Sequence, residues 1–284
     1  MKLLVFGKTG QVARELARAM PTEWNVTFLG REQADLEHPD QCAVAISDLR
    51  PDAVINAAAF TGVDKAEDEP EVAQTVNALA PAAMATAAQK LNVPFLHIST
   101  DYVFDGSGSE AFSPADPTGP LGVYGHSKLA GEQAIAEAGG KWFILRTSWV
   151  FSGHGANFAR TMLRLGAERD SLGVVEDQIG GPTPASEIAQ ALVAAARAMV
   201  DGQSGGIYHF AGAPFTSWAS FARAIMDNAD LDCRIDGIAT SGYPTPAERP
   251  RNSRLDCESF EQDFGIDRPK WRKTLPQVIS ELIE

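Results

Sequence analysis

Apolar runs alternate with segments of helical periodicity through the first half of the chain. Five short apolar runs have the length of buried parallel strands, at residues 2–6, 25–30, 52–59, 94–100 and 142–148. Between them, apolar positions recur at helical spacing in residues 11–20, 40–50, 69–91 and 129–138. Alternation of this kind predicts an α/β fold, in which a doubly wound parallel sheet carries helices on both faces.

The pattern changes after about residue 148. Segments become shorter and richer in Gly and Pro, and the clearest helices are expected at residues 184–200, 215–229 and 275–284. Thr216 or Ser217 is a plausible N-cap for the second of these. We therefore expect a Rossmann-type nucleotide-binding domain at residues 1–148 and a smaller α+β substrate-binding lobe at residues 149–284. The boundary is approximate, and elements can interleave across it.

Composition narrows the range of partners. The chain has 284 residues, 44% of them hydrophobic and 21% charged, as in an ordinary globular protein. Its formal net charge of −13 argues against a nucleic-acid partner, because binding a phosphate backbone requires a basic face. Neither a signal peptide nor an apolar stretch of spanning length is present, so no membrane partner is expected. Cys42, Cys233 and Cys257 form no disulfide or zinc pattern, which favours a reducing cytoplasmic location.

The first strand and the first helix are joined by a glycine-rich turn. Gly7 and Gly10 stand three residues apart, and Ala13 takes the place of a third glycine. Such a turn directs the N–H groups at the start of a helix toward a pyrophosphate, and the backbone amides of Gln11 and Val12 are well placed for this. A simple glycine-rich turn is the alternative interpretation. The position at the start of a βαβ unit favours a dinucleotide site.

The end of the second strand should select the cofactor. An acidic residue there holds the ribose of NAD, whereas an arginine can accommodate the 2′-phosphate of NADP. Arg31 occupies the position and no acid precedes Glu32, so the sequence favours NADPH, or tolerance of both NADPH and NADH. A solvated surface arginine is the alternative. Further cofactor contacts are expected from Asp35, Leu36, Ala57, Ala58 and Ala59.

A tyrosine and a lysine stand one helical turn apart at the start of the helix expected after the fourth strand, and the tyrosine is 24 positions after Thr100. Tyr124 and Lys128 would share one helix face, and Thr100 ends the strand at the edge where parallel sheets bind ligands. Reduction by hydride needs a proton donor for the new alcohol and a group that polarises the carbonyl. We expect Lys128 to lower the pKa of the Tyr124 hydroxyl, and Thr100 to donate a hydrogen bond to the carbonyl oxygen. Taken alone, Tyr124 could equally be an aromatic residue that packs in the core or caps the helix.

Together these segments resemble a known family. "GKTGQVA", "NAAAFTGVDKAE", "STDYVFDG" and "YGHSK" are similar to the extended short-chain dehydrogenases/reductases. "LRTSWVF", "DQIGGPTPASEIA", "GIYHFAG" and "RPRNSRLD" narrow the resemblance to the dTDP-4-dehydrorhamnose reductases, over nearly the whole chain. The resemblance implies NAD(P)H-dependent reduction of the 4-keto group of dTDP-4-dehydro-L-rhamnose. The product, dTDP-L-rhamnose, is a precursor for cell-surface polysaccharide such as lipopolysaccharide O-antigen.

The resemblance also implies roles for individual residues. Tyr124 would donate the proton, Lys128 would tune it and hold the nicotinamide ribose, and Thr100 would polarise the carbonyl. Contacts to the dTDP-deoxysugar are implied for Thr100, Asp101, Val103, Phe104, Tyr124, Trp149, Asn157 and Gln178, with Asn252 and Ser253 as further candidates. Some members hold a divalent ion at a subunit contact, and Glu15 and Glu187 are the matching acids for Mg²⁺ in a homodimer. Two solvated helix-face acids are the alternative.

Two other functions are compatible with the fold. A nucleotide-sugar epimerase or 4,6-dehydratase would recycle tightly bound NAD, whereas a reductase consumes NAD(P)H one for one. A dehydratase also needs a second carboxylate, and Tyr102 rather than Glu follows Asp101. A non-catalytic regulatory subunit on the same fold would be expected to have a degraded triad. Here Thr100, Tyr124 and Lys128 are all present.

Overall fold

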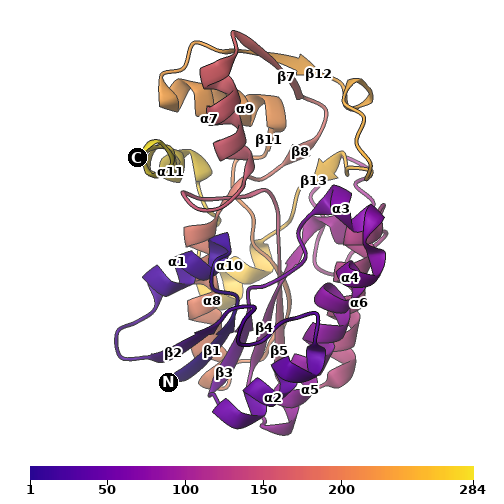
Figure 1. Ribbon diagram of the computed structural model, residues 1–284, viewed down its shortest axis with the longest axis vertical. Coiled ribbons are helices and arrows are strands. Elements are labelled where there is room, and N and C mark those ends of the chain that lie inside the picture. The colour runs from indigo at the N-terminus through magenta and orange to yellow at the C-terminus, as the bar shows by residue number, and fades with distance from the viewer.

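A six-stranded parallel sheet lies at the centre of the computed structural model, which describes all of residues 1–284 (Figure 1). Its strand order is β10-β5-β4-β3-β1-β2. The strands are β1 (Lys2–Phe6), β2 (Asn25–Leu29), β3 (Ala53–Asn56), β4 (Phe95–Thr100), β5 (Trp142–Thr147) and β10 (Gly206–His209). All five strands expected from the apolar runs are present, and the doubly wound Rossmann-type α/β fold is confirmed.

Helices cover both faces of this sheet. Helices α1 (Gln11–Ala19) and α8 (Ala185–Val200) pack against each other on one face. Helices α2 (Pro39–Leu49), α5 (Ala80–Lys90) and α6 (Val123–Ala138) lie on the other. Successive strand residues alternate between the two layers, so Leu3 faces α1 and α8 while Leu4 faces α2 and α5. A strand buried on both faces is apolar at most of its positions, which is why the strands appear in the sequence as nearly continuous apolar runs.

The long helix expected at residues 69–91 is interrupted. The structure has α4 (Pro70–Gln74), then a π-helical turn η1 (Thr75–Leu79), then α5, with α3 (Val63–Asp68) just before them. Pro81 has no N–H to bond the carbonyl of Asn77, four residues earlier, and its ring would crowd that group. The wider π turn removes this conflict.

Smaller sheets and helices make the second part of the molecule, above the main sheet in Figure 1. Its strands are β6 (Val150–Phe151), β7 (Ser171–Val175), β8 (Ile179–Gly180), β9 (Thr183–Pro184), β11 (Thr216–Ser217), β12 (Arg234–Ile238) and β13 (Asn252–Ser253). Its helices are α7 (Phe158–Glu168), α9 (Trp218–Ala229) and α11 (Trp271–Ile283), with a 3₁₀ turn η3 (Thr240–Gly242). The three helices share one hydrophobic cluster with β7 and β12. Ser217 caps α9 by accepting a hydrogen bond from Ser220 N–H, as expected.

The chain crosses between the two parts more than once. After residue 148 it returns to the main sheet as α8 and β10, and again as α10 (Glu258–Phe264), which packs on β10. More than half of the 21 buried residues in the cluster around α1 and α8 come from this second half of the chain. Residue 148 is therefore where the sequence pattern changes, and the two parts interleave beyond it.

Cys42, Cys233 and Cys257 are all buried and unpaired. Burial raises the pKa of the Cys42 thiol to about 12 and that of the Cys257 thiol to about 11, so neither ionises readily. The three cysteines pack as small apolar side chains, and all three are free thiols, as their spacing predicted. None of the helices has both the length and the apolar character needed to cross a membrane.

Candidate functional site

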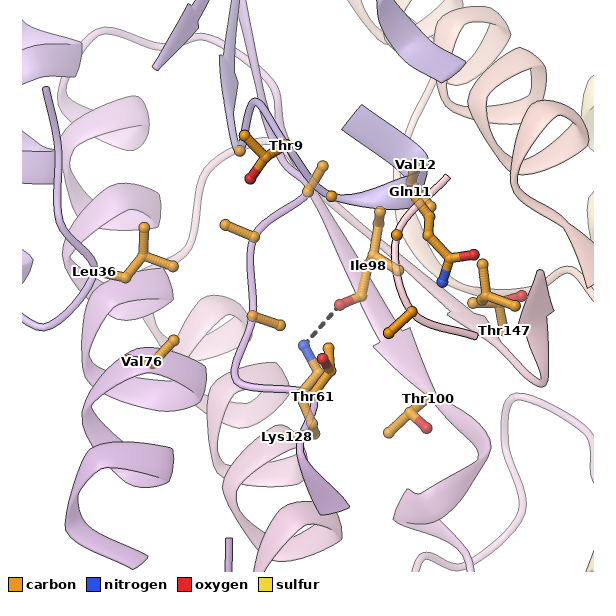
Figure 2. Close-up of a pocket in the computed structure, with 18 of the residues that line it drawn as sticks. Thr9, Gln11, Val12, Leu36, Thr61, Val76, Ile98, Thr100, Lys128 and Thr147 are labelled. Carbon is orange, nitrogen blue, oxygen red and sulfur yellow. Dashed lines mark hydrogen bonds between the residues drawn. The ribbon is translucent and has the colours of Figure 1, made fainter. Parts of the chain in front are cut away.

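A cavity of about 1250 Å³ lies at the carboxyl ends of the main-sheet strands, where β1, β3 and β4 meet residues of the second part (Figure 2). This is the edge at which open parallel sheets bind ligands. Most of the residues expected to bind cofactor or substrate line it. They are Gly7, Gly10, Gln11, Val12, Arg31, Asp35, Leu36, Ala57, Ala58, Ala59, Thr100, Asp101, Tyr124, Lys128, Trp149 and Asn157.

The glycine-rich turn forms a tight cradle at one end of the cavity. Gly7 has φ of +103°, and a Cβ there would lie 3.2 Å from the backbone carbon and oxygen of Ala57. No other residue suits both the conformation and the close approach. Helix α1 begins directly after Gly10 without a side-chain cap, so its first N–H groups are available to a phosphate. The cradle fits the pyrophosphate of a dinucleotide.

Arg31 lines the cavity, and its charge is already paired. Its guanidinium lies 2.6 Å from Glu37 Oε1 and 3.5 Å from Asp35 Oδ1, and its side chain is 72% exposed. Exposed ion pairs of this kind are weak and exchange readily. A 2′-phosphate would therefore compete with two carboxylates for this arginine, which the sequence alone did not predict.

Thr100, Tyr124 and Lys128 are all buried around the same end of the cavity. Thr100 ends β4, and its hydroxyl donates to Asp101 Oδ1 at 3.1 Å and accepts from Tyr102 N–H at 3.2 Å. Tyr124 and Lys128 lie on the first turns of α6. The structure therefore brings together the strand-end hydroxyl and the tyrosine–lysine pair that the sequence placed far apart.

The expected effect of Lys128 on Tyr124 is not seen. Burial raises the pKa of the Tyr124 hydroxyl to about 12, offset only in part by a hydrogen bond with Thr100. Lys128 Nζ instead donates to Ile98 O at 2.7 Å, the interaction dashed in Figure 2, and lies 2.9 Å from His97 Nε2. Lys128 Nζ is directed at β4 rather than at the phenol, and burial keeps Tyr124 protonated at neutral pH.

Two polar residues missed at the sequence level contact Lys128 or its partner. His97 lies in the middle of β4, and Asn56 lies beside it at the end of β3. Burial lowers the pKa of His97 far below its usual range, with Lys128 adding to the effect. Burial also lowers the pKa of Lys128 to about 8. The signal available in the sequence was a single histidine within the apolar run "FLHIS".

Trp149 forms an aromatic wall with a second tryptophan, also not predicted. Trp149 and Trp218 stack with ring centroids 3.6 Å apart and an angle of 11° between planes, and both line the cavity. Trp149 has φ of +49°, a region that bulky residues rarely adopt. A Cβ on Gly180 would lie 2.6 Å from the Trp149 ring, so that glycine makes room for the indole.

The polar residues nearby differ in their freedom to bind a ligand. Asp101 is 3% exposed, and its Oδ2 has no hydrogen-bond partner. Ser253 nearby lowers the pKa of this carboxyl, but less than burial raises it. Asn157 lines the cavity, but it caps α7 and its amide donates to Gln11 Oε1 at 3.1 Å. Asn252 donates to backbone carbonyls of residues 107 and 110.

Three residues expected at the substrate site lie outside the cavity. Val103, at the end of the 3₁₀ turn η2 (Asp101–Val103), and Phe104 are fully buried in a small apolar cluster. Phe104 stacks on Phe112 with centroids 4.3 Å apart. Gln178 is buried and donates to Thr240 Oγ1 at 3.2 Å. Their side chains pack against the protein, which corrects the expectation that they point at the sugar.

The two acids expected to share a metal are not brought together within the chain. Glu15 clusters with His154 and Glu281, and Glu187 is outside this group, where it accepts from Thr274. Arg18 lies 3.2 Å from Glu15 Oε1 and 3.3 Å from Glu281 Oε1. The two carboxylates suit a hard cation such as Mg²⁺, but Arg18 supplies their positive charge within one chain.

The amino-acid sequence is similar to one protein family over its whole length. The family model described as RmlD substrate binding domain matches residues 1–284. A dTDP-4-dehydrorhamnose reductase from Burkholderia thailandensis is 45% identical, and the match covers 100% of this chain and 99% of the relative.

Solved structures agree. The structure of a dTDP-4-dehydrorhamnose reductase from Clostridium acetobutylicum has a TM-score of 0.94 at 32% identity and covers 100% of both chains. That of a dTDP-4-dehydrorhamnose reductase from Bacillus anthracis in complex with NADP has a TM-score of 0.92 at 31% identity and covers 99% of each.

Proposed function

The chain belongs to the RmlD substrate binding domain family, and from that premise we propose that it is an NAD(P)H-dependent oxidoreductase. Its reaction is reduction of the 4-keto group of dTDP-4-dehydro-L-rhamnose to dTDP-L-rhamnose. The observation that carries this proposal is the gathering of Thr100, Tyr124 and Lys128 at one cavity with a dinucleotide cradle. The names of full-length relatives support the choice of sugar.

Different residues of the chain bind the cofactor, polarise the carbonyl and supply the proton. The Gly7–Val12 turn holds the pyrophosphate, and a bound nicotinamide supplies the hydride. Thr100, whose hydroxyl donates to Asp101 Oδ1 in the ligand-free chain, would turn that hydrogen to the carbonyl oxygen and so polarise the carbonyl. Tyr124, which burial keeps protonated, transfers its proton to that oxygen as the carbonyl is reduced. Lys128 would hold the nicotinamide ribose, and the stacked Trp149 and Trp218 offer a flat apolar wall to the nucleotide sugar.

Tyr124→Phe tests the acid. We expect turnover of the keto sugar, followed as NADPH oxidation, to fall by about 100-fold or more, because a positioned general acid contributes at least that much. Tyr208→Phe is the matched control, since Tyr208 lies outside the cavity and bonds Asp263 at 2.7 Å. Turnover within a few-fold of wild type in Tyr124→Phe would show that another group is the acid.

Cofactor stoichiometry separates this proposal from an epimerase or 4,6-dehydratase. A reductase consumes one NADPH or NADH for each sugar reduced, whereas the other enzymes regenerate their cofactor. We expect one mole of product per mole of cofactor oxidised. Conversion of sugar without net oxidation would favour the second class.

We also propose Mg²⁺ binding by the carboxylates of Glu15 and Glu281 at a contact between two copies of the chain, where Arg18 swings aside. The support is their closeness to each other and to His154. Sedimentation in Mg²⁺ and in chelator tests the proposal. We expect a dimer that dissociates when the ion is removed and that Glu15→Gln weakens. A monomer in both conditions would rule it out.

A further inference from the structure

We propose that Asn56 and His97 are a positioning pair for Lys128, in which Asn56 fixes the tautomer of the His97 imidazole. The imidazole then directs an N–H at Lys128 and favours the amine form of that side chain. The role of the pair in turnover rests on the proposed function. The hydrogen-bond arrangement itself is independent of the proposed function, because it involves only three side chains and the backbone groups of Ala58 and Ile98.

The three side chains form a continuous chain without solvent. Asn56, His97 and Lys128 are each no more than 1% exposed. Asn56 Nδ2 lies 3.1 Å from His97 Nδ1, and His97 Nε2 lies 2.9 Å from Lys128 Nζ. The chain has an anchor at each end. Ala58 N–H donates to Asn56 Oδ1 at 3.1 Å, and Lys128 Nζ donates to Ile98 O at 2.7 Å.

The Ala58 anchor decides which way the Asn56 amide faces. Its oxygen must accept from Ala58 N–H, so its NH₂ group faces His97 Nδ1. That nitrogen is therefore an acceptor. A fully buried imidazole between an amide and an amine is neutral and carries a single hydrogen, which must then sit on Nε2. The N–H on Nε2 is directed at Lys128 Nζ.

An amine completes this arrangement and an ammonium does not. A lysine amine has one lone pair and two hydrogens, so it can accept from His97 Nε2–H and donate to Ile98 O. An ammonium has three donors and no acceptor, so it would face Nε2–H donor to donor. Protonation of Lys128 requires the His97 hydrogen to move to Nδ1 and oppose the Asn56 amide. The charge on Lys128 is thus coupled to Asn56, and through it to Ala58 on the cofactor-lining loop.

Few other charged or titratable groups lie around Lys128. On its own helix are Tyr124 and Glu132, and the Glu132 carboxylate is held at 2.6 Å by Arg146 of β5. Asp101 follows β4. Glu132 raises the pKa of Lys128, while burial lowers it by more, to about 8. An acid of that strength exchanges protons efficiently near neutral pH. The charge that Lys128 carries near neutral pH is therefore sensitive to which hydrogen-bond partner His97 offers it.

The tautomer can be read directly by nuclear magnetic resonance of ¹⁵N-histidine-labelled protein without cofactor or substrate. Long-range ¹H–¹⁵N correlations show which ring nitrogen carries hydrogen, and loss of one set of signals in His97→Gln assigns the residue. At pH 9, above the pKa of Lys128, we expect a neutral ring with its hydrogen on Nε2. A hydrogen on Nδ1, or a charged ring, overturns the proposal.

Asn56→Asp reverses the arrangement with little change in shape. A carboxylate accepts both from Ala58 N–H and from His97 Nδ1–H, so Nε2 becomes an acceptor that suits the ammonium. We expect the His97 hydrogen to move to Nδ1. The change in kcat/KM near pH 8, which we assign to Lys128, should then occur at a pH higher by about one unit or more. An unmoved hydrogen in Asn56→Asp overturns the proposal.

The added charge of Asn56→Asp must be separated from the tautomer. The same change in a His97→Gln background keeps the charge and removes the imidazole, and we expect less than half of the shift to remain. A shift of full size there means that charge alone acts. His209→Gln is the control for loss of a buried histidine, because His209 contacts Arg146 and Phe112 rather than Lys128. We expect it to leave the pH of this change in kcat/KM unaltered.

These readouts separate two kinds of failure. If the wild-type chain does not reduce the keto sugar, the proposed function fails, and the resonance measurement still decides the tautomer. If turnover is normal and the hydrogen lies on Nδ1 at pH 9, the positioning pair alone is wrong.

Discussion

At the scale of single residues, the charge of a buried group depends on its partners. Asp101 has one oxygen bonded to Thr100 and the other without a partner, at 3% exposure. Burial raises its pKa from 3.8 to about 6. A buried carboxylate with an unsatisfied oxygen costs stability and is kept where a ligand completes it.

Asp101→Asn should therefore stabilise the ligand-free protein at pH 8. Between pH 3.8 and 6 the folded chain binds the Asp101 proton and the unfolded chain does not, so the destabilisation grows as pH rises through that range. This rise in the pKa of Asp101 corresponds to roughly 3 kcal/mol in the free energy of unfolding. Urea unfolding of both proteins at pH 8 and pH 4 checks this. The gain should be largest at pH 8, and an equal difference at both pH values would contradict it.

Arg31 and Glu37 should set cofactor preference in opposite directions. Glu37→Gln removes the closest partner of the Arg31 guanidinium, so we expect a higher ratio of kcat/KM for NADPH over NADH. Arg31→Ala removes the cation and should lower that ratio by about tenfold, the value of one charged contact. Steady-state kinetics with both cofactors measure this. If this ratio stays the same in both variants, the 2′-phosphate of NADPH does not bind at Arg31.

At the scale of elements, α6 positions the tyrosine and lysine through a close contact. Asn77 in the π turn η1 presents its backbone carbonyl to Gly131 of α6, where a Cβ would lie 2.1 Å from the oxygen. Asn77 also bonds Ser127, at 2.9 Å from its amide nitrogen. Pro81 leaves that carbonyl free of a helical partner, so the break in the long helix and the glycine in α6 are complementary.

Gly131→Ala should therefore destabilise the protein. Helix propensity alone predicts a gain of about 1 kcal/mol, but overpacking against backbone costs about 1–3 kcal/mol or more. We expect a net loss in the free energy of unfolding, together with reduced turnover as α6 shifts. Ala136→Gly, at an exposed site of the same helix, measures the propensity term. A Gly131→Ala protein more stable than wild type would contradict the contact.

At the scale of the whole molecule, segments from both halves of the chain build one hydrophobic core around the main sheet. Helix α8 packs on α1, and β10 extends the sheet beyond β5. Much of the cluster around α1 and α8 comes from residues after 148, including Ile188, Leu192 and Phe210. Without them, one face of the sheet and an edge strand would be exposed to water.

A fragment of residues 1–148 should not fold. It lacks α8, α10 and β10, so we expect no cooperative unfolding transition and no near-ultraviolet circular dichroism. The full chain, as the control, should unfold in a single transition. A fragment that melts cooperatively would establish an independent domain ending at residue 148.

The sequence by itself determined the local structure and the chemistry that neighbouring residues can supply. Apolar runs predicted the five strands, because a strand buried on both faces is apolar at most of its positions. The turn at Gly7 and Gly10 predicted the cradle, and the spacing of Tyr124 and Lys128 predicted their shared helix face. These features depend on residues only a few positions apart.

Only the tertiary structure decided what lies opposite those residues. The sequence predicted that Lys128 acts on Tyr124, but long-range packing directs its Nζ to His97 and Ile98 of β4. The family resemblance implied that Val103 and Phe104 contact the sugar, yet both are buried in an apolar cluster. The charge and direction of a buried side chain depend on groups that come from distant segments. No local pattern records those groups, and folding brings them together.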